Sequence, residues 1–105
     1  MTRRLMIVLL ATGLMSAGHV AADETADAEK IYRSVCKNCH GPKAQGMASY
    51  PKLSDKEPDY IAARLETYRA GEKIGPNSML MIPHAKNLSD GEIAALATYV
   101  TSAFE

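Results

Sequence analysis

The sequence predicts an all-α fold, and three observations support this prediction. Three stretches repeat their apolar residues at the spacing of three and four that a helix requires. No stretch alternates convincingly between apolar and polar residues, as a half-buried strand would. The third observation is the segment Val35-Cys36-Lys37-Asn38-Cys39-His40-Gly41, which holds both cysteines of the 105-residue chain and directly follows the first helical stretch.

The N-terminal segment, residues 1–22, has the order of a cleaved secretory signal. Two arginines precede the apolar run Leu5–Ala17, and small residues lead to Ala22. The run is shorter than the about 20 apolar residues that a membrane-spanning helix needs. We therefore expect cleavage after Ala22, a single domain of residues 23–105, and a periplasmic location without a membrane span. An uncleaved anchor is the alternative.

The charge pattern gives no sign of a nucleic-acid partner. The whole chain has 12 basic and 12 acidic residues, so loss of Arg3 and Arg4 with the signal leaves a net charge of −2. No basic stripe alternates with aromatic residues. Five lysines near the cysteine pair and in later loops could steer an acidic partner, although a solvated mixed-charge surface is the simpler interpretation: Lys37, Lys43, Lys52, Lys73 and Lys86.

The first expected helix covers Ala26–Cys36 and leads straight into the cysteine pair. Its apolar residues recur with a helical period: Ala28, Ile31, Tyr32 and Val35. The next stretch, Gly41–Pro51, contains several helix breakers and no period, which predicts a loop. A second helix is expected over Pro58–Ala70, because proline suits a first helical turn and Gly71 provides a stop.

The last part of the chain is expected to form an irregular loop and then a helix. Gly75, Pro76 and Pro83 interrupt the stretch Glu72–Leu88, whose apolar group Met79-Leu80-Met81-Ile82 is expected to cover something. Ser89-Asp90-Gly91-Glu92 then has the S-x-x-E pattern of a capping box. The apolar stripe of the following helix is Ile93, Leu96, Ala97, Val100 and Phe104.

Few large apolar side chains are available for the core. The chain has no Trp, one Phe and five Tyr, and a domain of this size is only marginally stabilised by its core alone. A large, flat, apolar cofactor that is covalently attached would supply both the missing core and a cross-link.

Three chemistries use a cysteine pair with this spacing. A dithiol switch normally begins a helix after a buried strand, but this pair follows a helix. A zinc site needs four ligands, and Cys36, Cys39 and His84 supply only three. Cys-x-x-Cys-His is the signature of covalent heme attachment, in which both thiols form thioethers and His40 becomes the proximal iron ligand. We favour heme and keep the other two as alternatives.

With this motif the chain resembles the class I mono-heme cytochromes c of bacteria. The resemblance covers essentially all of Ala26–Phe104 and includes VCKNCHG, the segment Pro51-Lys52-Leu53, the helix ending YRAG, and LSDGEIAALATYV after a methionine-bearing loop. It implies a class I cytochrome c fold, with three to five short helices wrapped around one covalently bound heme c. It also implies that the carbonyl of Pro51 accepts the second ring N–H of His40, a partner that metal-bound imidazoles usually have.

The second axial ligand is expected in the loop before the last helix. Met79, Met81 and His84 are all chemically competent for heme iron. The resemblance implies a thioether ligand, and its usual position relative to the capping serine favours Met81 over Met79, with His84 third. The residues not used would merely pack, as methionine often does, and Met47 is expected to do the same.

The predicted function is one-electron transport in the periplasm by a protein that is not itself an enzyme. Its partners would be periplasmic dehydrogenases, oxidases or other cytochromes. A heme subunit of a periplasmic dehydrogenase complex is one alternative, because the methionine loop and AKNLSDGE also resemble the cytochrome subunit of flavocytochrome c sulfide dehydrogenases. A five-coordinate heme enzyme or gas sensor is another.

Overall fold

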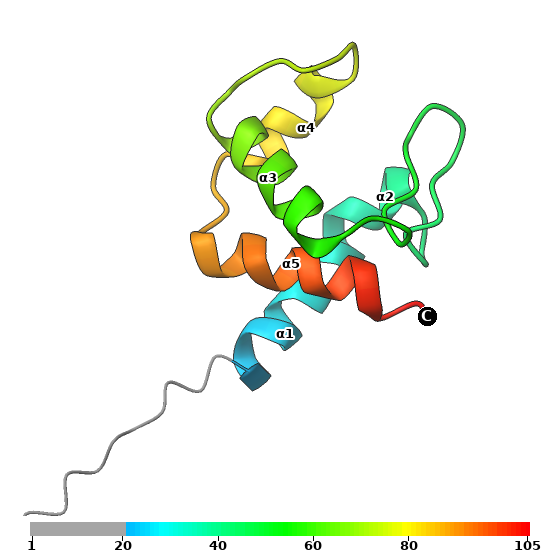
Figure 1. Ribbon diagram of the computed structural model, residues 1–105, viewed down its shortest axis with the longest axis vertical. Coiled ribbons are helices and arrows are strands. Elements are labelled where there is room, and N and C mark those ends of the chain that lie inside the picture. The colour runs from blue at the N-terminus through cyan, green and yellow to red at the C-terminus, as the bar shows by residue number, and fades with distance from the viewer. Residues whose placement is uncertain (1–20) are drawn as a thin grey trace, which may run out of the picture.

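The computed structural model describes the backbone of residues 21–105 and the side chains of residues 26–105. Its elements in chain order are α1 (Ala21–Ile31), a π-helical turn η1 (Tyr32–Cys36), α2 (Lys37–His40), α3 (Pro58–Arg69), α4 (Ser78–Ala85) and α5 (Asp90–Ser102) (Figure 1). Within this part of the chain the only β feature is an isolated bridge between Met47 and Tyr50. The predicted all-α class is therefore confirmed.

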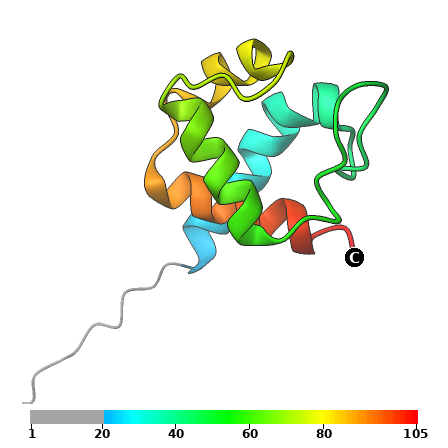
Figure 2. The same ribbon diagram turned by 45° about the horizontal axis from the view of Figure 1, so that its top comes forward.

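Helix α5 is the centre of the fold. It packs against α1 on one side and α3 on the other, and α4 packs against α3. Figures 1 and 2 show α5 crossing between the blue α1 and the green α3, with the yellow α4 beyond α3. Helices α2 and α4 do not pack extensively against each other.

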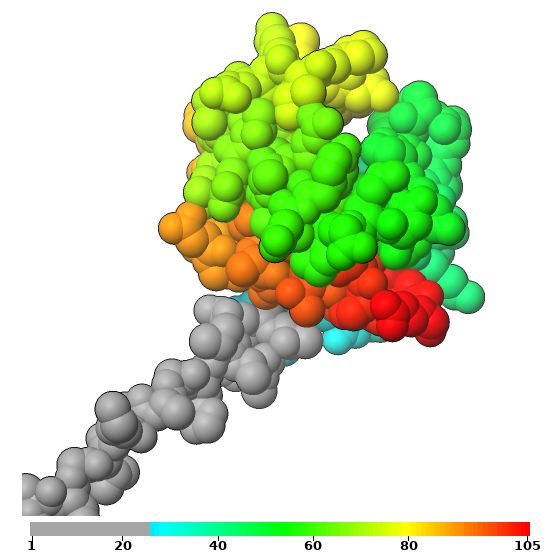
Figure 3. Space-filling view, viewed as in Figure 1, coloured from blue at the N-terminus to red at the C-terminus, as the bar shows by residue number. Residues whose placement is uncertain are grey.

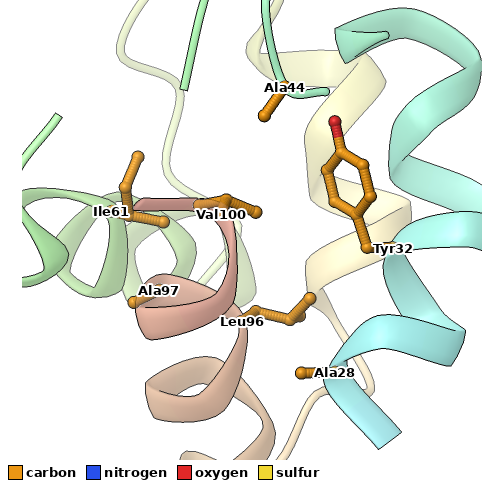
Figure 4. Close-up of a cluster of buried hydrophobic side chains, with 7 residues drawn as sticks. All are labelled: Ala28, Tyr32, Ala44, Ile61, Leu96, Ala97 and Val100. Carbon is orange, nitrogen blue, oxygen red and sulfur yellow. The ribbon is translucent and has the colours of Figure 1, made fainter. Parts of the chain in front are cut away.

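The core lies where α1, α3 and α5 meet. Its side chains come from α1, η1, α3 and α5 and from the loop after α2 (Figure 4): Ala28, Tyr32, Ala44, Ile61, Leu96, Ala97 and Val100. The small side chain of Ala28 is 1% exposed and lies at the crossing of α1 with α5. Three aromatic rings, those of Tyr32, Tyr99 and Phe104, extend this core, with centroids 5.5 to 5.8 Å apart.

The predicted helices agree with the structure in type, and the second and last also agree nearly in length. The first is longer than predicted, because the backbone is already helical at Ala21, five residues before the predicted start at Ala26. Helical backbone continues through the cysteine pair to His40, beyond the predicted end at Cys36, and a π-helical turn directly precedes the pair. Helix α3 begins with Pro58 in its first turn, and Gly71 follows its end with φ of +81°. At α5, Ser89 accepts a hydrogen bond from the amide of Glu92, and the Glu92 carboxylate accepts one from the amide of Ser89, which confirms the capping box.

The prediction of an irregular loop over Glu72–Leu88 is wrong in its second half. Helix α4 occupies Ser78–Ala85 and contains Pro83. A proline at this position removes one backbone hydrogen bond, but the helix keeps a buried face. Its inward residues follow the helical spacing i, i+3, i+4, i+7, a pattern that the breakers obscured in the sequence: Ser78, Met81, Ile82 and Ala85.

The signal segment lies mostly outside the described residues. Cleavage after Ala22 and the domain boundaries 1–22 and 23–105 therefore stay predictions. Of the helices formed by residues 21–105, none combines the length and the apolar character needed to cross a bilayer.

Candidate heme site

A large apolar cavity opens between the cysteine-bearing helical stretch and α4. Its volume is about 810 Å³, within the range of about 300–1,000 Å³ typical of small-molecule sites. Its walls come from η1 and α2, the loop over residues 49–56, α3, the segment 74–84 and α5. Figure 3 shows its opening between the yellow-green segment before α4 and the blue-green loop after α2.

Both cysteines lie on the wall of this cavity. Cys36 and Cys39 are partly buried and neither forms a disulfide. Helical backbone across the pair puts the residues one turn apart, so both thiols belong to the same wall. Burial raises the pKa of the Cys36 thiol to about 11, because a low-polarity environment disfavours the thiolate. The Cys36 thiol is therefore a neutral group on an apolar surface.

His40 lies on the same wall with its ring orientation fixed. Its Nδ1 is 2.9 Å from the carbonyl oxygen of Pro51. Since a carbonyl only accepts, Nδ1 must carry the hydrogen, and in the neutral ring Nε2 then has a free lone pair. The ring is buried, and both His40 and Pro51 line the cavity. The contact expected from the family resemblance is present in the structure.

The loop that brings Pro51 to His40 depends on Gly46. The Gly46 amide donates a hydrogen bond to the His40 carbonyl, at 2.7 Å. Gly46 has φ of +80°, and a Cβ there would lie 2.7 Å from backbone atoms of Tyr50 and Lys52, the residues on either side of Pro51. Only glycine allows this close approach without displacing the loop.

The structure separates the candidates for the opposite ligand. Met81 is half-buried and lines the cavity. His84 also lines the cavity. Met79 is 64% exposed and is not part of the cavity wall. Met47, expected to pack, is 45% exposed and also lies outside the wall. Met81 is therefore the only methionine of the described residues that shares a cavity with His40.

Several lining residues were not anticipated from the sequence. Tyr60, Arg64 and Tyr68 lie one turn apart along one face of α3 and contribute to the wall. The Arg64 guanidinium lies 5.2 Å from the centre of the Tyr60 ring, and its Nε donates to the Tyr60 hydroxyl. The i, i+4, i+8 spacing of these residues was the available signal.

The five lysines considered above are all exposed, and only Lys52 among them lines the cavity.

These residues fit a covalently attached heme. Two thiols and one imidazole with a free nitrogen lie on one wall, and a thioether and a second imidazole lie among the residues from α4. The remaining wall is mostly apolar, with Leu, Ile, Val, Pro and Tyr side chains. An α-helical fold with Cys-x-x-Cys-His on such a cavity defines a c-type cytochrome.

Comparison with known proteins agrees with this class. Residues 23–100 match the family described as cytochrome c oxidase, cbb3-type, subunit III. The chain is 40% identical over 83 residues to cytochrome c-554(548) of Halomonas halodenitrificans, covering 78% of this chain and 98% of that protein. It is 31% identical over 94 residues to cytochrome c-554(547) of Halothiobacillus neapolitanus, covering 82% and 98%.

A third relative has a name that includes a partner. The thiosulfate dehydrogenase electron acceptor of Stutzerimonas stutzeri is 37% identical over 65 residues, which cover 61% of this chain and 30% of that protein.

The family match and the two relatives matched over nearly their whole length establish the family. The chain belongs to the cytochrome c family and is of the class I monoheme type. It carries a covalently bound heme c and is an electron-transfer protein rather than a catalytic enzyme.

Proposed function

We propose that this protein is a periplasmic electron carrier in which His40 and Met81 are the two axial ligands of the heme iron. Cys36 and Cys39 would hold the heme through thioether bonds, and Pro51 would fix the proximal histidine. The observation that carries this assignment is the shared cavity: His40 and Met81 both line it, while Met79 does not.

The residues of the chain set the properties of the site. The heme supplies a one-electron couple when bound. The hydrogen bond to Pro51 holds the His40 ring in one orientation and keeps the lone pair of Nε2 available to bind the iron. With the soft thioether of Met81 as a ligand, the ferrous state is more strongly favoured than it would be with a second imidazole. The apolar lining excludes water and so disfavours the additional charge of the ferric state.

Paired methionine variants of the heme-loaded protein test the ligand assignment. Met81→Ala should remove the long-wavelength sulfur-to-iron absorption band and allow the ferrous protein to bind carbon monoxide rapidly. Met79→Ala is the matched control and should retain the band and resist carbon monoxide. A Met81→Ala variant with an unchanged spectrum would refute the assignment, and His84→Ala would then identify or exclude the imidazole on the same wall.

The proposed donor class is a periplasmic dehydrogenase. Two relatives are named as electron acceptors of thiosulfate dehydrogenase, which supports a partner of this kind. The partner could hold the protein permanently as a heme subunit or release it as a free carrier. Gel filtration of a native periplasmic extract distinguishes the two, because a permanent subunit would co-elute with dehydrogenase activity and a free carrier would elute alone at low mass.

A further inference from the structure

The segment that carries Met81 is joined to the rest of the structure by few polar contacts. Among the described residues, every hydrogen bond formed by residues 73–88 stays inside that segment, apart from one that Leu88 accepts from Arg69. Within the segment, Ser78 accepts from the amides of Ile74 and Gly75 and so organises the start of α4. The segment is therefore internally ordered, and its attachment depends on packing and on Arg69.

Arg69 joins the two ends of this segment. It is the last residue of α3, and its Nη1 donates to the carbonyl oxygen of Leu88 at 3.1 Å, nineteen positions along the chain. Its Nη2 lies 2.7 Å from Oδ1 of Asp90, the first residue of α5. One guanidinium thus contacts the chain on both sides of Ser89, the residue that caps α5.

The two contacts of Arg69 differ in environment. The Arg69 side chain is 30% exposed, whereas that of Asp90 is 90% exposed, so the ion pair is well solvated and contributes little. The hydrogen bond to Leu88 is partly buried and has a charged donor, which makes it stronger than a neutral one. The Leu88 contact is therefore the important one.

We propose that Arg69 is a positioning residue for the sixth ligand: it closes the base of segment 73–88 and thereby keeps Met81 at the iron. The part concerning Met81 rests on the proposed function. Without the Arg69–Leu88 hydrogen bond, the two ends of the segment can move apart. The entropy of the opened loop then favours states in which α4 moves away from the cavity wall. The packing of α4 against α3, with Ala85 and Ser78 buried, and the proposed Met81–iron bond would then be the remaining restraints.

The test uses the heme-loaded protein with Arg69→Gln, Arg69→Lys and a control, Arg33→Gln. Arg33 forms an exposed ion pair with Glu29 on α1, so its loss removes an arginine without touching the segment. Arg69→Gln should accelerate both carbon monoxide binding to the ferrous protein and amide exchange over residues 74–87 by about tenfold. Arg69→Lys, which keeps a charged donor group but has one nitrogen in place of two, should be intermediate, and Arg33→Gln should match the wild type.

The exchange data separate positioning from general destabilisation. The proposal requires the increase to be confined to residues 74–87, with amides of Leu96–Val100 in α5 unaffected. An equal increase in both regions would overturn it, as would faster exchange in the segment with unchanged carbon monoxide binding. The methionine variants report on the iron ligand independently of Arg69, so an incorrect Met81 assignment would be recognised separately.

Discussion

The hydroxyl of Tyr32 donates a hydrogen bond to the carbonyl oxygen of Gly41, the residue that follows His40. Tyr32 is 1% exposed and its ring packs against Tyr99 of α5 and Phe104. A single side chain therefore links the helical core to the backbone at the proximal ligand. The position of His40 is coupled in this way to the packing of α1 against α5.

Tyr32→Phe should lower the free energy of unfolding by about 1 kcal/mol, because it removes the hydroxyl but keeps the ring. The cost is moderate since Gly41 also accepts from the amide of Ala44. Denaturant unfolding of the heme-loaded protein measures it. The matched control is Tyr60→Phe, because Tyr60 is 46% exposed and, among the described residues, its hydroxyl is hydrogen-bonded only to Arg64. An equal effect in both variants would contradict the assigned role of Tyr32.

Ionisation of the Tyr32 hydroxyl should make the free energy of unfolding depend on pH. Burial raises the pKa of Tyr32 to about 12, compared with about 10 when solvated. The folded state therefore holds this proton more tightly, and the resulting stability is complete below pH 10 and lost as the pH rises through 12. Over that window the stability of the wild type relative to Tyr32→Phe should fall by up to about 1.4 kcal/mol per pH unit, so the wild type, which is more stable by about 1 kcal/mol below pH 10, becomes the less stable of the two. A difference that stays constant from pH 9 to 12 would rule out this linkage.

Substitution by alanine should destabilise the protein more at Gly46 than at Gly71. Both have positive φ, near +80°, but a Cβ at Gly46 would meet the backbone of residues 50–52, whereas one at Gly71 would meet nothing within 4 Å. We expect Gly71→Ala to cost about 1 kcal/mol from backbone strain and Gly46→Ala about 2–4 kcal/mol, because the clash adds to the strain. Thermal or denaturant unfolding measures both. Equal costs would show that the loop moves freely away from Pro51.

Local patterns predicted most of the fold and part of the site. The capping box of Ser89 and Glu92, the first-turn Pro58 and the Cys36-x-x-Cys39-His40 motif each act within a few residues, so their consequences can be read from short stretches. Helix α4 was missed because Pro83 outweighed a helical pattern of buried residues. Its buried face is stabilised by packing on α3, a tertiary effect that single-sequence propensities do not contain.

Contacts between distant residues were the hardest to anticipate. The His40–Pro51 hydrogen bond was expected only because of the family resemblance, and the Arg69–Leu88 bond, nineteen positions apart, was not expected at all. Neither follows from periodicity, because both depend on how loops return to helices. In the same way, only the family resemblance favoured Met81 over Met79 from the sequence, and their different burial in the folded chain supports that order.

The most direct test of the account is the visible spectrum of the wild-type protein, exported by a host with heme-attachment machinery. It should be recorded oxidised and reduced, and again after adding carbon monoxide to the reduced sample. We predict a weak long-wavelength sulfur-to-iron band in the oxidised form and no rapid response to carbon monoxide in the reduced form. A missing band together with immediate carbon monoxide binding would show an open iron and contradict the His40/Met81 electron carrier.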